Sequence, residues 1–375
     1  MARLLDHISG HLFGRDKTRR TPRSNRAYRC DCGKLAYFLD RDCRKCGQAL
    51  GYEADMGEMR SLKAGSVPGV WRLAGDGGMP EYRRCAGLLT PAECNWLVPA
   101  ESNATQCLAC RLNRKTPDPN EAGNPGYWRA VEISKRRLIS QLLGLGLPIV
   151  SKAEDPRNGL AFDLLRSPAA GPQVMTGHAG GLITINIEEA DDLKRQQLKT
   201  AMNEPYRTLL GHFRHEIGHY YWDRLVWNTA WLEPFRGLFG DERADYAESL
   251  KANYEGKYPS DWPQRFISRY ASCHPWEDWA ETWAHYLHIV DSLDTAVCHG
   301  LELDLFDENA DHFNLDDLYD PGHPEARRSL HFPNCWMEMV ATLNRLARSL
   351  GQPDFYPFEI RGVRLTSFGD FAIVA

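Results

Sequence analysis

The sequence lacks any apolar segment long enough to cross a membrane. Its longest apolar run, residues 138–150, is interrupted by Gly144, Gly146 and Pro148 and is shorter than the roughly 20 residues of a spanning helix. The N-terminus also lacks the apolar core and small-residue cleavage site of a secretory signal. These absences predict a cytoplasmic protein with no membrane partner.

The hydrophobic and charged fractions of the sequence are close to those of an average globular protein. Of 375 residues, 43% are hydrophobic and 25% are charged, which excludes a collagen-like, coiled-coil or wholly disordered chain. Charge is spread unevenly, because residues 1–120 carry a formal charge of +7 and residues 121–375 carry −12. This division indicates two regions with different roles.

Cysteines are concentrated near the N-terminus, where eight of the eleven precede residue 111. Close pairs of cysteines in a reducing compartment indicate metal binding more often than disulfides. The spacing predicts one structural zinc on Cys30, Cys32, Cys43 and Cys46, and a second on Cys85, Cys94, Cys107 and Cys110. A zinc ion with four thiolate ligands carries a net charge of about −2. With two such sites, the charge of residues 1–120 falls from +7 to roughly +3. We therefore expect a protein partner for these modules rather than nucleic acid.

The expected fold class is α+β, with two small zinc ribbons ahead of a catalytic domain. A basic flexible tail is predicted over residues 1–27, the first ribbon over 28–57, and the second four-cysteine module with a linker over 58–120. A cluster of Pro and Gly between residues 117 and 126 marks the next boundary. The catalytic domain is then predicted over 126–350, and a C-terminal extension over 351–375.

The strongest chemical signal is His215-Glu216-Ile217-Gly218-His219. Positions i and i+4 share one face of a helix, so both histidines can bind one zinc ion, and Glu216 can act as general base on its water. A third histidine six residues further on is absent, because position 225 is Leu.

The third zinc ligand must therefore come from elsewhere in the chain. Glu277 and Glu281 share a face of a helix that Pro275 can open, so either can bind zinc while the other orients a histidine. His285 is an alternative ligand on the same face. Asp223, four residues after His219, is a candidate to orient that histidine.

The segments HEIGHYYWDRL, HPWEDWAETWAHYLHI, YRCDCGKLAYF and CRKCGQALGY resemble a bacterial family of zinc-binding metallopeptidases with an N-terminal zinc ribbon. Residues 270–281 are also similar, more distantly, to the Tyr-x6-Glu-x3-Glu pattern of gluzincins. The resemblance implies a zincin-type domain in which Glu277 is the zinc ligand, Glu281 supports a ligand, and Tyr270 assists the oxyanion.

Residues 181–187 alternate in side-chain character and are expected to form an edge strand of the zincin sheet. An extended peptide can pair with such an edge, so Gly181, Leu182 and Thr184 are predicted to bind substrate. The overall prediction is a zinc-dependent metallopeptidase with one catalytic and two structural zinc ions. The alternative is a zinc-ribbon scaffold that binds protein or nucleic acid and carries a non-catalytic zincin domain.

Overall fold

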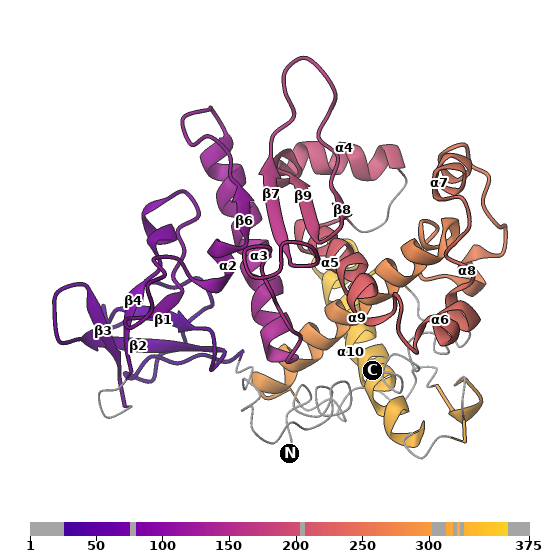
Figure 1. Ribbon diagram of the computed structural model, residues 1–375. Coiled ribbons are helices and arrows are strands. Elements are labelled where there is room, and N and C mark those ends of the chain that lie inside the picture. The colour runs from indigo at the N-terminus through magenta and orange to yellow at the C-terminus, as the bar shows by residue number, and fades with distance from the viewer. Residues whose placement is uncertain are drawn as a thin grey trace. The chain divides into compact units, whose positions relative to one another are not determined.

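The computed structural model describes residues 26–75, 80–202, 207–301, 313–317, 321–322 and 326–358 (Figure 1). Most of the predicted basic tail and the end of the predicted C-terminal extension lie outside these residues. The chain forms two compact units. The N-terminal unit contains residues 17–202 and 208–213, and the helical unit contains residues 214–375.

The N-terminal unit begins with a five-stranded antiparallel sheet whose strands follow chain order. The strands are β1 (Leu50–Glu53), β2 (Glu58–Ala64), β3 (Val70–Leu73), β4 (Glu81–Arg84) and β5 (Leu97–Pro99). Strands β2 to β5 each contribute one side chain to a buried cluster of Leu62, Leu73, Tyr82 and Leu97. Both cysteine modules adjoin this one sheet, the first before β1 and the second around η1 (Ala86–Leu89) and α2 (Leu108–Arg111).

Asn95, which is 1% exposed, connects the two cysteine modules. Its backbone carbonyl accepts from the N–H of Tyr52 at 3.0 Å, and its side-chain amide donates to the carbonyls of Phe38 and Asp40. The neighbouring Trp96 ring lies 4.8 Å from the ring of Tyr52. Residues from both modules therefore share one core.

A second sheet follows, with strand order β6-β7-β9-β8. Its strands are β6 (Asn113–Lys115), β7 (Ala161–Leu165), β8 (Gly177–Ala179) and β9 (Leu182–Asn186), and α3 (Asn124–Gly144) connects β6 to β7. Strand β9 pairs with β7 in parallel and with β8 antiparallel, so the expectation that it is an edge strand is wrong. The reason is a hairpin turn at Gly180 and Gly181, whose φ angles of +52° and +82° fold β8 back onto β9.

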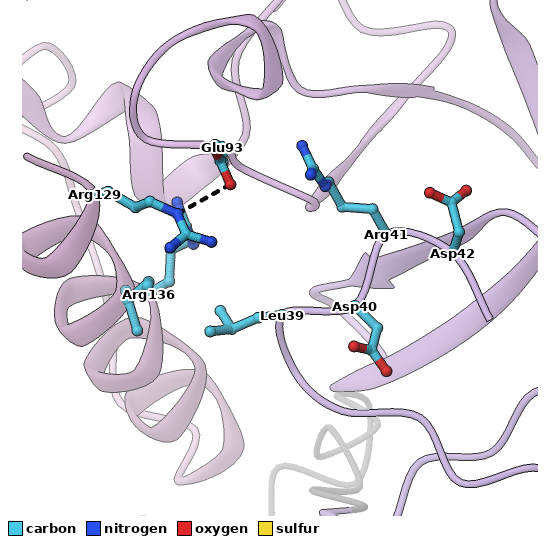
Figure 2. Close-up of a pocket in the computed structure, with 8 residues that line it drawn as sticks. Leu39, Asp40, Arg41, Asp42, Glu93, Arg129 and Arg136 are labelled. Carbon is cyan, nitrogen blue, oxygen red and sulfur yellow. Dashed lines mark hydrogen bonds and ion pairs between the residues drawn. The ribbon is translucent and has the colours of Figure 1, made fainter. Parts of the chain in front are cut away.

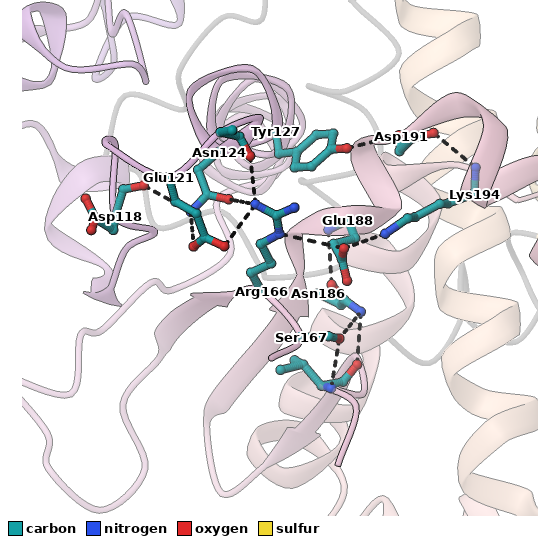
Figure 3. Close-up of polar contacts among 12 residues, drawn as sticks. Asp118, Glu121, Asn124, Tyr127, Arg166, Ser167, Asn186, Glu188, Asp191 and Lys194 are labelled. Carbon is teal, nitrogen blue, oxygen red and sulfur yellow. Dashed lines mark hydrogen bonds and ion pairs between the residues drawn. The ribbon is translucent and has the colours of Figure 1, made fainter. Parts of the chain in front are cut away.

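Arg166, directly after β7, fixes the loop that precedes α3 (Figure 3). Its guanidinium donates to Glu121, to the carbonyl of Ala122 and to Asn124 at 2.8–3.1 Å. The hydroxyl of Tyr127 on α3 donates to Asp191 at 3.0 Å. These bonds hold the start of α3 against the segment formed by η2 (Ile187–Ala190) and α4 (Asp192–Met202).

Helices build the second unit, and two of them carry the histidine pair and the glutamate pair singled out in the sequence. Helix α5 (Leu209–Leu225) contains the two histidines, and α9 (Pro275–Cys298) contains the two glutamates. Pro275 opens α9, and the His274 ring accepts from the Trp276 N–H as a cap. The other elements are α6 (Leu232–Phe239), α7 (Tyr246–Tyr254), α8 (Trp262–Arg265), η3 (Ala271–Cys273), η5 (Leu315–Asp317) and α10 (Ala326–Ser349).

Gly218 allows α5 and α9 to pack closely. A Cβ atom at this position would lie 3.1 Å from Ala280 Cα and 3.2 Å from Trp283 Cβ. The indole of Trp279 donates to the Gly218 carbonyl at 2.9 Å across the same contact. A side chain here would require its neighbours to move by a few tenths of an ångström, so glycine favours the close approach of the helices near the middle of the histidine motif. No helix in the described ranges has the length and apolar character needed to span a membrane.

Candidate metal centres

The first cysteine module brings four sulfur atoms together. Sγ of Cys30 lies 3.7 Å from that of Cys46, and Sγ of Cys32 lies 3.6 Å from that of Cys43. All four ligand atoms lie within 4.8 Å of one another. A tetrahedral zinc with bonds of about 2.3 Å places its sulfurs about 3.8 Å apart, so the cluster has zinc-site dimensions.

Two turns shape this first cluster. Gly33 and Gly47, each directly after a cysteine, have φ angles of +80° and +74°, which favour glycine. The backbone N–H groups of Cys46 and Lys45 lower the pKa of Cys43 to about 6. Zinc binds the thiolate, so these amides favour the form of the side chain that the metal needs.

The second module is wholly buried. Cys85, Cys94, Cys107 and Cys110 are each at most 4% exposed, and Sγ of Cys94 lies 3.7 Å from that of Cys107. Cys85 Sγ accepts from the N–H groups of Gly87 and Cys107 at 3.4 and 3.2 Å. A Cβ on Gly87 would lie 3.0 Å from Cys110 Sγ, so the backbone here fits closely around the sulfurs. The predicted grouping of the eight cysteines into two clusters of four is confirmed.

A third cluster lies between α5 and α9 in the helical unit. His215 Nε2 and His219 Nε2 are 3.2 Å apart, and Glu277 Oε2 lies 3.0 and 3.5 Å from them. Ligands of a tetrahedral zinc with bonds of about 2.0–2.1 Å are separated by about 3.3 Å. Glu277 Oε2 is buried and faces the two imidazole nitrogens. Two imidazoles and one carboxylate form the donor set of zinc sites that keep one position open, so these residues fit the ion.

The electrostatics of this cluster favour a cation. Burial opposes charge on both partners, yet hydrogen bonds to Glu277 and Glu281 raise the pKa of His215 well above its usual range. The two histidines likewise hold the pKa of the buried Glu277 well below its usual range. A divalent ion can replace the proton that this arrangement attracts, and its binding therefore competes with protonation.

Three side chains around the cluster hold its members in place. His215 Nδ1 lies 2.8 Å from Glu281 Oε1, and Ser268 Oγ donates to Glu281 Oε2 at 2.6 Å. The hydroxyl of Tyr246 donates to Glu277 Oε1 at 2.6 Å, leaving Oε2 directed toward the histidines. Tyr246 and Ser268 could not be predicted from the sequence, because they come from α7 and from the segment before η3, outside any local motif.

The remaining candidates lie at different distances from the cluster. Glu216 is 8% exposed and directly follows His215 on α5. The Tyr270 ring centroid lies 5.9 Å from that of His215. Partial desolvation of the Asp223 carboxylate raises its pKa above the usual value, and the charge of His219 only partly offsets this rise. His285, the alternative ligand, instead makes a hydrogen bond to the Tyr356 hydroxyl and is not part of the cluster.

Gly181, Leu182 and Thr184 belong to the N-terminal unit and to the β8–β9 hairpin. Leu182 pairs with Ala161 on one side and Ala179 on the other, and Thr184 is flanked in the same way. Strand addition by a peptide at this strand is therefore excluded, since both sides are occupied. Contact of these residues with substrate by another route stays a prediction.

The fold and the three clusters define a mixed helix and sheet protein with a zinc-ribbon domain followed by a metallopeptidase-type domain. The profile of a zinc-ribbon domain matches residues 27–121. The profile of the family described as "Putative zinc-binding metallo-peptidase" matches residues 124–366. The chain belongs to this metallopeptidase family, and the resemblance to zinc-binding metallopeptidases with an N-terminal zinc ribbon is confirmed.

Relatives share both parts of the chain. Uncharacterized proteins of Mycobacterium bovis and of two strains of Mycobacterium tuberculosis are each 43% identical over 338 residues. The match covers 89% of this chain and 90% of each relative. No solved structure matches the chain.

Proposed function

We propose that the protein hydrolyses peptide bonds at a zinc ion held by His215, His219 and Glu277. The observation that supports this is the convergence of two imidazole nitrogens and one buried carboxylate oxygen within 3.0–3.5 Å, with Glu216 beside them. When bound, zinc supplies a Lewis acid that polarises a carbonyl group and activates water.

Glu216 is proposed as the general base. It lies on the same helix as the two histidines and next to one of them, so its carboxylate can take a proton from the attacking water. The same carboxyl group then gives the proton to the leaving amine nitrogen. Such transfer by a positioned side chain contributes typically about 10²–10⁴-fold to the rate.

The surrounding side chains have positioning roles in this proposal. Glu281 fixes the ring of His215 and is itself fixed by Ser268. Tyr246 binds one oxygen of Glu277, so that the other faces the histidines. Tyr270 lies beside the His215 ring, and its phenol is the candidate donor to the oxyanion that develops at the scissile carbonyl. Asp223 is the candidate to orient His219.

Comparison of the wild type with Glu216→Gln tests the proposal. Both zinc-loaded proteins are incubated with peptides derived from a whole proteome, and new termini are identified by mass spectrometry. Glu248→Gln is the matched control, because it makes the same chemical change at an exposed position of α7. We expect new termini with the wild type and the control but not with Glu216→Gln, at equal zinc content. Equal cleavage by all three, or none by the wild type, would favour a binding scaffold instead.

A further inference from the structure

The two cysteine modules of the N-terminal unit differ in how far solvent reaches their sulfur atoms. All four cysteines of the second module are buried, with exposed fractions of 0–4%. In the first module Cys30 and Cys43 are buried, Cys32 is half-buried, and Cys46 is exposed. Small solutes can therefore reach Cys46 directly, whereas the protein shields the thiolates of the second module.

The exposure of Cys46 follows from its place at the end of a tight turn. The N–H of Gly47 donates to the Cys43 carbonyl at 2.8 Å, and residues 44–47 are all exposed. Two cationic residues, Arg44 and Lys45, directly precede Cys46 in this turn. Reactive cysteines occur in partly exposed, electropositive surroundings of this kind, and buried structural cysteines are inert.

The loop that leads into this turn is fixed by bonds that involve no cysteine. Residues 39–42 line a hollow of about 260 Å³, opposite α3 (Figure 2). Arg84 Nη2 donates to the Arg41 carbonyl at 3.2 Å, and the Asn95 amide donates to the Asp40 carbonyl at 3.1 Å. Because neither bond uses a metal ligand, both remain available to hold the loop when the module has no metal ion.

A second thiolate lies next to the exposed one. Sγ of Cys30 is 3.7 Å from Sγ of Cys46. Ser61 Oγ, on β2, donates to the same Cys30 sulfur at 3.5 Å and so fixes it in the interior. An accessible cysteine beside a second cysteine that can resolve it is the arrangement of redox-sensing sites.

We propose that Cys46 is a site of oxidation by hydroperoxides and that Cys30 resolves the product as a disulfide. The Cys46 thiolate attacks one oxygen of hydrogen peroxide, so that an S–O bond forms, the O–O bond breaks and hydroxide leaves. The Cys30 thiolate then attacks the sulfur of the sulfenic acid, so that the S–S bond forms, the S–O bond breaks and a second hydroxide leaves. The two thiolates lose two electrons, the peroxide gains them, and two protons convert the hydroxides to water.

The disulfide takes away two of the four thiolates that would hold zinc in the first module. That module should then release its ion, while the second keeps its four thiolates because they are buried. Resolution by Cys30 also protects Cys46 from irreversible oxidation to the sulfonic acid. Reduction by a dithiol should restore the site, because the loop stays anchored through Arg84 and Asn95.

Peroxide treatment of the zinc-loaded full chain tests the proposal. After treatment, free thiols are alkylated in denaturant with a chelator, and oxidised cysteines and disulfides are mapped by mass spectrometry. We expect a disulfide between Cys30 and Cys46, with the cysteines of the second module oxidised at least about 10-fold more slowly. Protein-bound zinc, measured after gel filtration, should fall in parallel, and dithiothreitol with added zinc should restore it.

Two variants locate the reactive sulfur. Cys46→His keeps a zinc ligand, since three cysteines and one histidine also form closed zinc sites, but an imidazole cannot enter a disulfide. It should lose zinc to peroxide at least about 10-fold more slowly than the wild type. Cys32→His is the matched control, because it makes the same change at the half-buried cysteine of the module, and it should remain as sensitive as the wild type. Zinc content before treatment shows that each variant is loaded.

Several results would overturn the assignment. These are equal rates of oxidation in the two modules, disulfides that do not include Cys46, and loss of zinc from Cys46→His as fast as from the wild type. If Cys46→His does not load zinc, the cysteine map of the wild type decides. None of these measurements depends on peptidase activity, so this proposal and the proposed function can fail separately.

Discussion

Replacing Gly218 with alanine tests whether the close approach of α5 and α9 builds the metal centre. The new Cβ would lie 3.1 Å from Ala280 Cα and 3.2 Å from Trp283 Cβ. Carbon atoms in ordinary contact are about 3.5–4.0 Å apart, so the helices must separate by roughly 0.4 Å or more. Glu277 and Glu281 lie on α9 within three residues of Ala280.

We expect Gly218→Ala to lower the zinc affinity more than it lowers the stability of the fold. Metal–ligand distances are held within about 0.2 Å, so a shift of this size should weaken zinc binding by roughly 10–100-fold, as outer-shell changes do. Overpacking costs about 1–3 kcal/mol, but alanine recovers about 0.5–1 kcal/mol in a helix. The net loss of stability for Gly218→Ala is therefore at most about 2.5 kcal/mol, by these two estimates.

Zinc affinity is measured by competition with a chelator, and stability by thermal unfolding of the metal-free protein. Gly237→Ala is the matched control, because a Cβ on this α6 residue would meet no atom within 4 Å. The control should bind zinc like the wild type and be slightly more stable. If Gly218→Ala bound zinc as tightly as the wild type, the close contact would not be what places Glu277, and the reasoning would be refuted.

Other predictions address the same centres. Metal analysis should give about three zinc equivalents per chain, and chelation should first remove the ion bound by histidine and glutamate; a stable protein with one zinc or none would contradict this. Glu277→Ala should abolish zinc binding at the histidine–glutamate site, whereas Glu281→Ala should weaken it about 10–100-fold. If Glu281→Ala had the larger effect, Glu281 would be the ligand. Tyr246→Phe should lower zinc affinity roughly 10-fold by removing a hydrogen bond to a charged oxygen; an unchanged chelator titration would remove Tyr246 from the site. Tyr270→Phe should lower kcat roughly 10–1,000-fold with zinc content unchanged, and full activity would exclude a role in the reaction.

The grouping of the candidate metal ligands could be predicted, because it depends on local spacing in the sequence. Two histidines four residues apart on a helix lie on the same face. In a close pair of cysteines, a single tight turn brings the two sulfur atoms near each other. The start of α9 could also be predicted, since Pro275 can open a helix.

The parts that could not be predicted depend on contacts between distant segments. Tyr246 lies 31 residues before Glu277, and Ser268 lies 13 before Glu281, so no periodicity relates them. The edge prediction for β9 failed for a different reason. Strand β8 has only three residues, too few to show alternation, and nothing local shows that Gly180 and Gly181 form a hairpin turn.

The position of Asn95 has a consequence for how the N-terminal unit acquires its metals. Its side chain holds the loop of the first cysteine module, while the residue before it, Cys94, belongs to the second. When zinc binds and orders one module, it therefore also stabilises the loop conformation that the other module needs to bind zinc. We expect the two thiolate sites to be thermodynamically linked, so that the first ion raises the affinity for the second. In a population short of zinc, chains would then tend to hold both structural ions or neither.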